Sequence, residues 1–209
     1  MSDWPALAAQ IGFAETARAE ELSLAQWIAL TNLFSPTSES SAQNVHGEIF
    51  DVVDENDCAI CTASRHEVHT RKLRHRAVHV FVFNRAGELF LQKRSRWKDA
   101  HPSKWDSSAS GHVNAGDDYD TTAPREIEEE LGVWSRVEFV AKISACKNTG
   151  QEFVQLYRAV HDGPFVLARS EIECGSFFPM PLIAEWIPKR PQDFASGFVE
   201  CFKVFAEKE

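Results

Sequence analysis

The first part of the chain carries apolar residues at helical intervals, followed by a stretch without bulky apolar side chains. Helical spacing connects Trp4, Leu7 and Ile11, and it recurs over residues 24–28. Residues 35–44 then contain four serines and one proline, a composition typical of a linker. The pattern therefore predicts a short N-terminal helical arm with its linker over residues 1–44.

From residue 45 onward, short runs of β-branched and aromatic residues alternate with turns and amphipathic segments. The turn at residues 84–87 predicts a hairpin between the runs on either side of it. We therefore expect a mixed α+β domain over residues 45–209. Its strands are predicted over 48–54, 78–84, 88–92, 136–146 and 152–160, with a further short strand after a turn within residues 54–61. Its helices are predicted over 121–131, 181–187 and 193–205.

Composition and charge exclude several classes of protein. The 209 residues are 44% apolar, and 31 acidic against 22 basic side chains give a formal net charge of −9. An acidic chain is a poor candidate for nucleic-acid binding, because binding to a phosphate backbone relies on excess cations. The sequence has neither an apolar run of about 18 residues nor a signal-peptide pattern. Five scattered cysteines fit a reducing compartment, so we expect a cytoplasmic protein without membrane partners.

The acidic residues gather in one loop and one predicted helix. Residues 117–130 contain seven acids and one base, Arg125. Glu126, Glu129 and Glu130 are spaced to share one helical face, where like charges destabilise a bare helix. A divalent cation such as Mg²⁺ would make this spacing tolerable, since it prefers oxygen ligands. The alternative is a solvated acidic face. Arg125 is placed to reach Glu129 one turn later.

The segment 111–133 resembles the Nudix box. This motif has a glycine, then a glutamate after five residues, then Arg-Glu-apolar-x-Glu-Glu-x-Gly-apolar after seven more. Asp117 departs from it by standing where the box has glutamate. Pro124 is also unusual, because proline fits a helix without loss only in the first turn, and so the helix should begin near Thr121 or kink. The matching positions are Gly111, Arg125, Glu126, Ile127, Glu129, Glu130, Gly132 and Val133.

This resemblance implies a Nudix-type α/β/α sandwich with a mixed central sheet. It also implies hydrolysis of a small-molecule substrate, a nucleoside diphosphate linked to another group. Glu126, Glu129 and Glu130 would bind Mg²⁺ or Mn²⁺, Gly111 would offer its carbonyl oxygen, and Arg125 would orient Glu129. The resemblance leaves the catalytic base open between Glu129 or Glu130 in the box and three acids outside it, Glu152, Glu171 and Glu173.

Residues 48–160 also resemble the isopentenyl-diphosphate isomerase branch of the same superfamily. Three histidines and one glutamate fall where that isomerase binds a metal, and this implies an additional divalent ion at His69, His75, His112 and Glu152. Gly150 replaces the isomerase's other glutamate ligand. The alternative is that these histidines are surface or hydrogen-bonded residues. Two cations, Arg94 and Lys98, match positions that hold the diphosphate.

The residues that carry the isomerase chemistry differ. Ser110 stands where the isomerase has its catalytic cysteine, and Glu126 stands where it has a third cation. A hydroxyl without an adjacent base cannot readily replace a thiolate. We therefore expect a hydrolase, with an isomerase or a non-catalytic ligand-binding domain as alternatives. The arm 1–44 would contact a partner, cap the domain or form a homodimer.

Overall fold

The computed structural model describes residues 14, 16 and 47–208. The chain divides into two compact units, Met1–Asn44 and Val45–Glu209. The predicted helical arm and linker lie outside the described residues. Within residues 47–208, no helix combines the length and the apolar character needed to cross a bilayer.

The second unit begins with a small hairpin sheet and a short helix. Strands β1 (Ile49–Val53) and β2 (Ala59–Ser64) pair antiparallel, and α4 (Arg65–Arg71) follows directly. The helix begins there because Ser64 and Glu67 form a capping box, in which each side chain bonds the other residue's backbone N–H. Helix α4 therefore follows β2 with no intervening loop.

A seven-stranded mixed sheet forms the centre of this unit. Its strand order is β5-β4-β3-β8-β7, with β6 also paired to β3 and β9 to β4. Strands β3 and β8 run parallel and the other pairs are antiparallel. The strand bounds are β3 His75–Phe83, β4 Leu89–Arg94, β5 Trp105–Asp106, β6 Ala109–His112, β7 Val137–Ile143, β8 Glu152–Val160 and β9 Ile172–Phe178.

The sheet opens between β6 and β4. Strand β4 pairs with β3 only at the end of the hairpin, where Phe83 faces Leu89. Further along β3, residues 77–80 pair with β6 instead. Strands β4 and β6 thus share one edge of β3, and β4 diverges from β3 where β6 is paired with it. The opening lets side chains from a neighbouring helix reach both β4 and β6.

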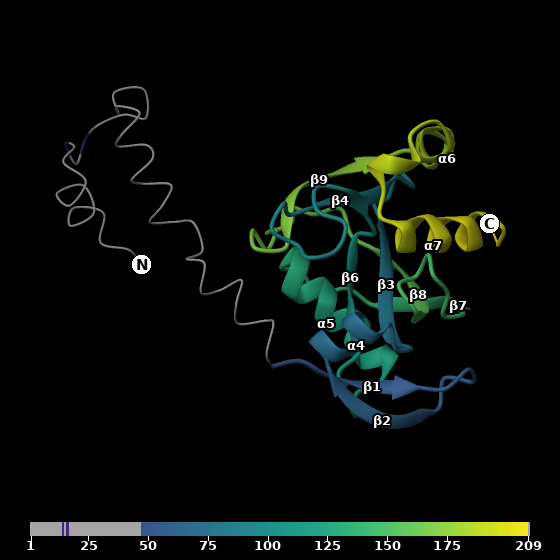
Figure 1. Ribbon diagram of the computed structural model, residues 1–209. Coiled ribbons are helices and arrows are strands. Elements are labelled where there is room, and N and C mark those ends of the chain that lie inside the picture. The colour runs from purple at the N-terminus through teal and green to yellow at the C-terminus, as the bar shows by residue number, and fades with distance from the viewer. Residues whose placement is uncertain (1–13, 15, 17–46, 209) are drawn as a thin grey trace. The chain divides into compact units, whose positions relative to one another are not determined.

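Helices cover both faces of the sheet. Helix α5 (Tyr119–Leu131) lies on one face, where Ile127 and Leu131 are fully buried as their spacing predicts. Helices α6 (Met180–Lys189) and α7 (Ser196–Ala206) pack their apolar side chains against the other face. Figure 1 shows α5 and α7 on opposite sides of β3.

Most predicted elements are present, with several differences. Helix α5 begins at Tyr119, two residues before the predicted start, because the Asp118 side chain caps it by accepting a hydrogen bond from the Thr121 N–H. Pro124 lies inside the helix. The pattern missed α4, β5, β6 and β9. Strands β5 and β6 are too short to show alternation, and β9 depends on its pairing with β4.

Candidate active site

Glu126 lies directly against Gly111. A Cβ atom added at residue 111 would come within 2.2 Å of the Glu126 carboxyl carbon, a distance that non-bonded atoms do not adopt. The Glu126 side chain is nearly buried in this position. Glu126 can therefore keep this position only with a glycine at residue 111, because its carboxylate occupies the space that any other side chain would fill.

Glu130, one turn further along α5, reaches into the opening of the sheet. Its Oε2 atom accepts hydrogen bonds from the Gln92 Nε2 on β4 at 2.8 Å and from the Ser110 N–H on β6 at 3.1 Å. Glu130 is buried. The divergence of β4 from β6 thus gives this carboxylate a donor on each side.

Arg125 links the third box carboxylate, that of Glu129, to Glu126. Its Nη1 atom donates to both carboxylate oxygens of Glu129 at 3.2 Å, as the spacing predicts. Its Nη2 atom lies 3.1 Å from Glu126 Oε1. Glu129 remains exposed, with 56% of its side chain accessible. The three glutamates therefore form a cluster with two buried members and one at the surface.

Burial changes the acidity of the two inner carboxyl groups. Burial, followed by the nearby charge of Glu130, raises the pKa of Glu126 to about 8. Burial also raises the pKa of Glu130 to about 7, and the opposing charge of Lys98 is too weak to cancel this rise. Both carboxyl groups are therefore less acidic than an exposed glutamate. A divalent cation bound beside them would favour their ionised forms.

Lys98 and Arg94 lie beside this cluster, and both already have partners. The Lys98 ammonium pairs with Glu171, and burial lowers its pKa. The Nη1 of Arg94 is 2.9 Å from Asp106 Oδ2. The structure thus brings both predicted substrate-binding cations close to Glu130, whose charge acts on Lys98 and whose pKa both cations lower.

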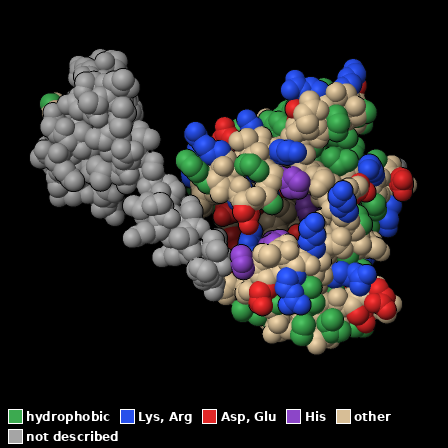
Figure 2. Space-filling view, in the orientation of Figure 1, with side chains coloured by type: hydrophobic (Ala, Val, Ile, Leu, Met, Phe, Trp, Pro, Cys, Tyr) green, Lys and Arg blue, Asp and Glu red, His purple; other side chains and the backbone are tan. Residues whose placement is uncertain are grey.

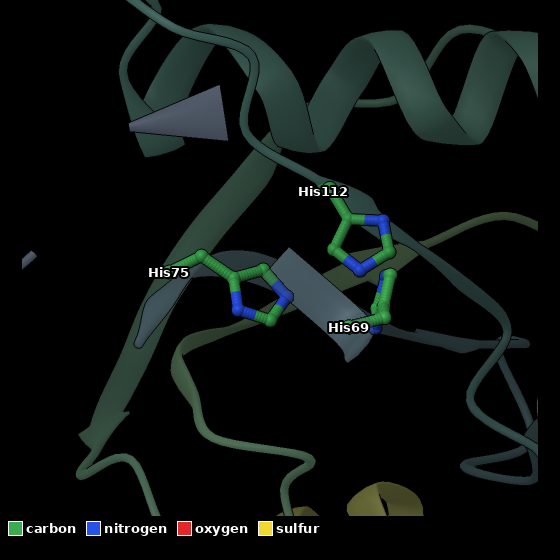
Figure 3. Close-up of side chains that lie close together, drawn as sticks. All are labelled: His69, His75 and His112. Carbon is green, nitrogen blue, oxygen red and sulfur yellow. The ribbon is translucent and has the colours of Figure 1, made fainter. Parts of the chain in front are cut away.

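Three histidines form a second cluster (Figure 3), and Glu152 lies beside them. One ring nitrogen from each of His69, His75 and His112 lies within 4.8 Å of the others. Glu152 Oε1 is 3.2 Å from His112 Nε2 and 3.5 Å from His75 Nε2. The register of the parallel strands explains this, since His75 and Glu152 are paired across β3 and β8. Figure 2 shows histidine, acidic and basic side chains around a hollow in the domain.

The second cluster brings ring nitrogens together in a partly buried place. His75 Nδ1 lies 2.9 Å from the Leu73 carbonyl oxygen and donates to it. His75 Nε2 is buried and makes no hydrogen bond among the described residues. Partial burial and the nearby His112 and His75 lower the pKa of His69 to about 4. Although burial opposes it, the hydrogen bond with His112 and the nearby His75 hold the pKa of Glu152 well below its ordinary value.

Some residues of the site escaped the sequence analysis. Gln92, the partner of Glu130, gives no signal of its own because a glutamine on a strand is unremarkable. Helix α4, which carries His69, had a readable signal in the Ser64-x-x-Glu67 capping box.

Comparisons with known proteins point to one family. The model of the NUDIX domain family matches residues 73–195. An uncharacterised Nudix hydrolase of Yersinia pestis is 36% identical over 131 residues, 60% of this chain and 70% of the relative. One from Pseudomonas aeruginosa is 34% identical over 139 residues, 66% and 82% of the two chains. The crystal structure of DR0079 from Deinococcus radiodurans, at 24% identity, covers 77% of this chain and 99% of its own with a TM-score of 0.67, a likeness of fold.

Proposed function

We propose, from the premise that this chain belongs to the Nudix hydrolase family, that it cleaves the phosphoanhydride bond of a nucleoside diphosphate derivative or a related organic diphosphate. The family implies a small-molecule diphosphate substrate. The observation that carries the proposal is the contact of the Glu126 carboxylate with Gly111, beside the buried Glu130. These are the positions at which the box glutamates are expected to bind metal.

Mg²⁺, or Mn²⁺ in its place, would be held by Glu126, Glu129, Glu130 and the Gly111 carbonyl oxygen. The raised pKa values of Glu126 and Glu130 support this assignment, because burial disfavours their charged forms and a bound cation would offset that cost. When bound, such an ion neutralises charge on phosphoryl oxygens and acidifies water. Arg125 would hold Glu129 in one orientation through its two hydrogen bonds.

The catalytic base is best sought within the box. Among the described residues, Glu130 makes no ion pair. Glu171 pairs with Lys98, Glu173 lies 3.8 Å from Lys93 and Glu152 contacts two histidines, while within the box Glu129 is bonded to Arg125. We assign the role to Glu129 or Glu130, which would accept the proton of the attacking water. Lys98 and Arg94 would contact the anionic part of the substrate.

The histidine cluster would hold an additional divalent ion at His69, His75, His112 and Glu152. The buried Nε2 atom of His75 supports this, since a buried polar atom without a hydrogen-bond partner is unfavourable. Imidazole nitrogens together with a carboxylate oxygen form a ligand set that suits zinc, iron or manganese. Because the isomerase binds its metal through matching residues, isomerisation of a prenyl diphosphate stays the alternative function.

The isomerase alternative is weaker because of Ser110. This residue stands in place of the thiol, and its backbone N–H supports Glu130 in the box. Incubation with isopentenyl diphosphate in deuterated water distinguishes the two functions, since an isomerase exchanges protons with solvent. A third alternative, a non-catalytic binding domain in which the arm 1–44 contacts a partner or forms a homodimer, predicts binding without turnover.

The test is a phosphate-release screen with Mg²⁺ and Mn²⁺. The panel comprises nucleotide sugars, dinucleotides, coenzyme A, nucleoside triphosphates and prenyl diphosphates. We expect metal-dependent hydrolysis of at least one compound. Absence of turnover on the whole panel, together with binding of one of its members, would favour the non-catalytic alternative.

A further inference from the structure

A buried polar turn between β5 and β6 plays no part in the proposed chemistry. Asp106, Ser107 and Ser108 are consecutive and almost inaccessible to solvent. The Ser108 hydroxyl donates to the Phe90 carbonyl oxygen at 2.5 Å and accepts from the Val82 N–H at 2.7 Å. The turn is therefore fixed to β4 and to β3, the two strands that diverge at the site.

This anchoring holds the Asp106 carboxylate in one orientation. Its Oδ1 atom accepts a hydrogen bond from the Ser107 N–H at 2.8 Å. The Ser107 hydroxyl is bonded in turn to His79 Nδ1 at 2.6 Å. The other carboxylate oxygen, Oδ2, faces Arg94 Nη1 at 2.9 Å. Asp106 thus joins a rigid part of the sheet to a cation at the site.

Arg94 is held at two of its three guanidinium nitrogens. Nη1 donates to Asp106, and Nε donates to the Ala100 carbonyl oxygen at 3.1 Å. Among the described residues, the Nη2 atom of Arg94 makes no hydrogen bond. This atom is also not fully buried. One edge of the guanidinium is therefore oriented by the protein while Nη2 is left for another acceptor.

We propose that Asp106 is a positioning residue that orients Arg94 toward an anionic oxygen of the substrate's diphosphate group. The inference rests on the proposed function, in which Arg94 contacts that group. An arginine fixed before binding loses less side-chain freedom when it binds, and a planar guanidinium matches phosphate oxygens in direction as well as charge. Asp106 acts through Arg94 and does not touch the substrate.

The test measures binding of methylenediphosphonate, a diphosphate analogue that cannot be hydrolysed, to the full chain with Mg²⁺ by calorimetry. We expect Asp106→Asn to weaken binding about tenfold, in line with loss of a charged hydrogen bond. Arg94→Ala should weaken it at least as much, and the double variant should bind like Arg94→Ala alone. Asp162→Asn is the matched control, because it removes an Arg–Asp pair with Arg85 on the surface.

Thermal unfolding of each variant separates positioning from a merely structural role. A structural Asp106 would lower the melting temperature yet leave the affinity of the folded protein unchanged. If Asp106→Asn does not fold, Arg94→Lys is measured in its place. This variant keeps the positive charge but loses the paired N–H donors of the guanidinium, so about tenfold weaker binding is expected. Unchanged affinity in the folded variant, additive effects of Asp106→Asn and Arg94→Ala, or no binding to the unmodified chain would overturn the inference.

The same data distinguish this inference from the proposed function. Phosphate release from the panel, combined with an affinity that Asp106→Asn does not change, refutes the positioning role and leaves hydrolysis standing. Affinity that depends on Asp106 and Arg94, combined with no phosphate release from any compound, supports the positioning role and refutes hydrolysis.

Discussion

The carboxylate of Glu126 occupies the space in which residue 111 would place a side chain, and Gly111 leaves that space free. This contact joins strand β6 to helix α5 through two residues that are fifteen positions apart in the sequence. It explains in steric terms why a glycine and a glutamate are required together. It also shows which substitution would disturb the site with least effect elsewhere.

Gly111→Ala should displace Glu126 and leave the fold intact. The added methyl group would meet the end of a flexible side chain, so the carboxylate moves and the backbone stays. We expect turnover to fall by about 100-fold, comparable to loss of an important charged contact at a catalytic centre. Phosphate release and Mn²⁺ titration measure the effect. Gly47→Ala is the control, because nothing lies within 4 Å of its added Cβ; equal activity of the two variants would contradict the prediction.

The box glutamates should be essential for turnover, unlike their neighbour on the same helix. Glu129→Gln and Glu130→Gln each remove a carboxylate from the metal cluster, so we expect kcat to fall by about 100-fold or more. Glu128→Gln should remain within about twofold of the unmodified chain, because Glu128 is exposed and lies outside the set of matching positions. Circular dichroism establishes that each variant is folded. Rates like those of the unmodified chain for both Glu129→Gln and Glu130→Gln would remove the catalytic assignment.

The metal-free protein should lose stability as the pH rises from 6.5 to 8.5. Burial raises the pKa of Glu126 to about 8 and that of Glu130 to about 7, whereas both groups are already ionised in the unfolded chain above pH 6. The folded state therefore binds more protons in this range, so raising the pH favours unfolding. Melting temperatures in EDTA measure the loss.

Two comparisons check the origin of this pH dependence. Glu126→Gln should flatten it, since the variant has no carboxyl to ionise at that position. Mg²⁺ should raise the melting temperature more at pH 8.5 than at pH 6.5, because the ion binds the ionised carboxylates. A pH dependence that is the same with and without Glu126 would assign the effect to other groups.

The histidine cluster should bind a transition metal on its own. Co²⁺ is a suitable probe, because its visible absorption reports ligation by nitrogen. We expect His69→Ala and His75→Ala to weaken Co²⁺ binding by at least about tenfold. His66→Ala is the control, since His66 lies exposed on the same helix and outside the cluster. Co²⁺ spectra that are identical for His66→Ala and His69→Ala would show that the histidines are not ligands.

The local pattern of residues predicted an α+β domain, and the resemblance to the Nudix box implied a Nudix fold with a mixed central sheet; both expectations are confirmed. It also predicted the acidic helix, its buried Ile127 and Leu131, and the contact between Arg125 and Glu129. These features depend on spacing within one or two helical turns, and such spacing can be read from the sequence alone. The membership of the family followed from the same segment.

The sequence alone could not decide which groups surround that helix. Gln92 and Ser110 meet Glu130 because β6 displaces β4 from β3, and Asp106 reaches Arg94 because the turn after β5 is fixed to both strands. Glu152 joins the histidines through the register of two parallel strands. These contacts connect residues far apart along the chain, so strand pairing and packing decide them and no local periodicity records them.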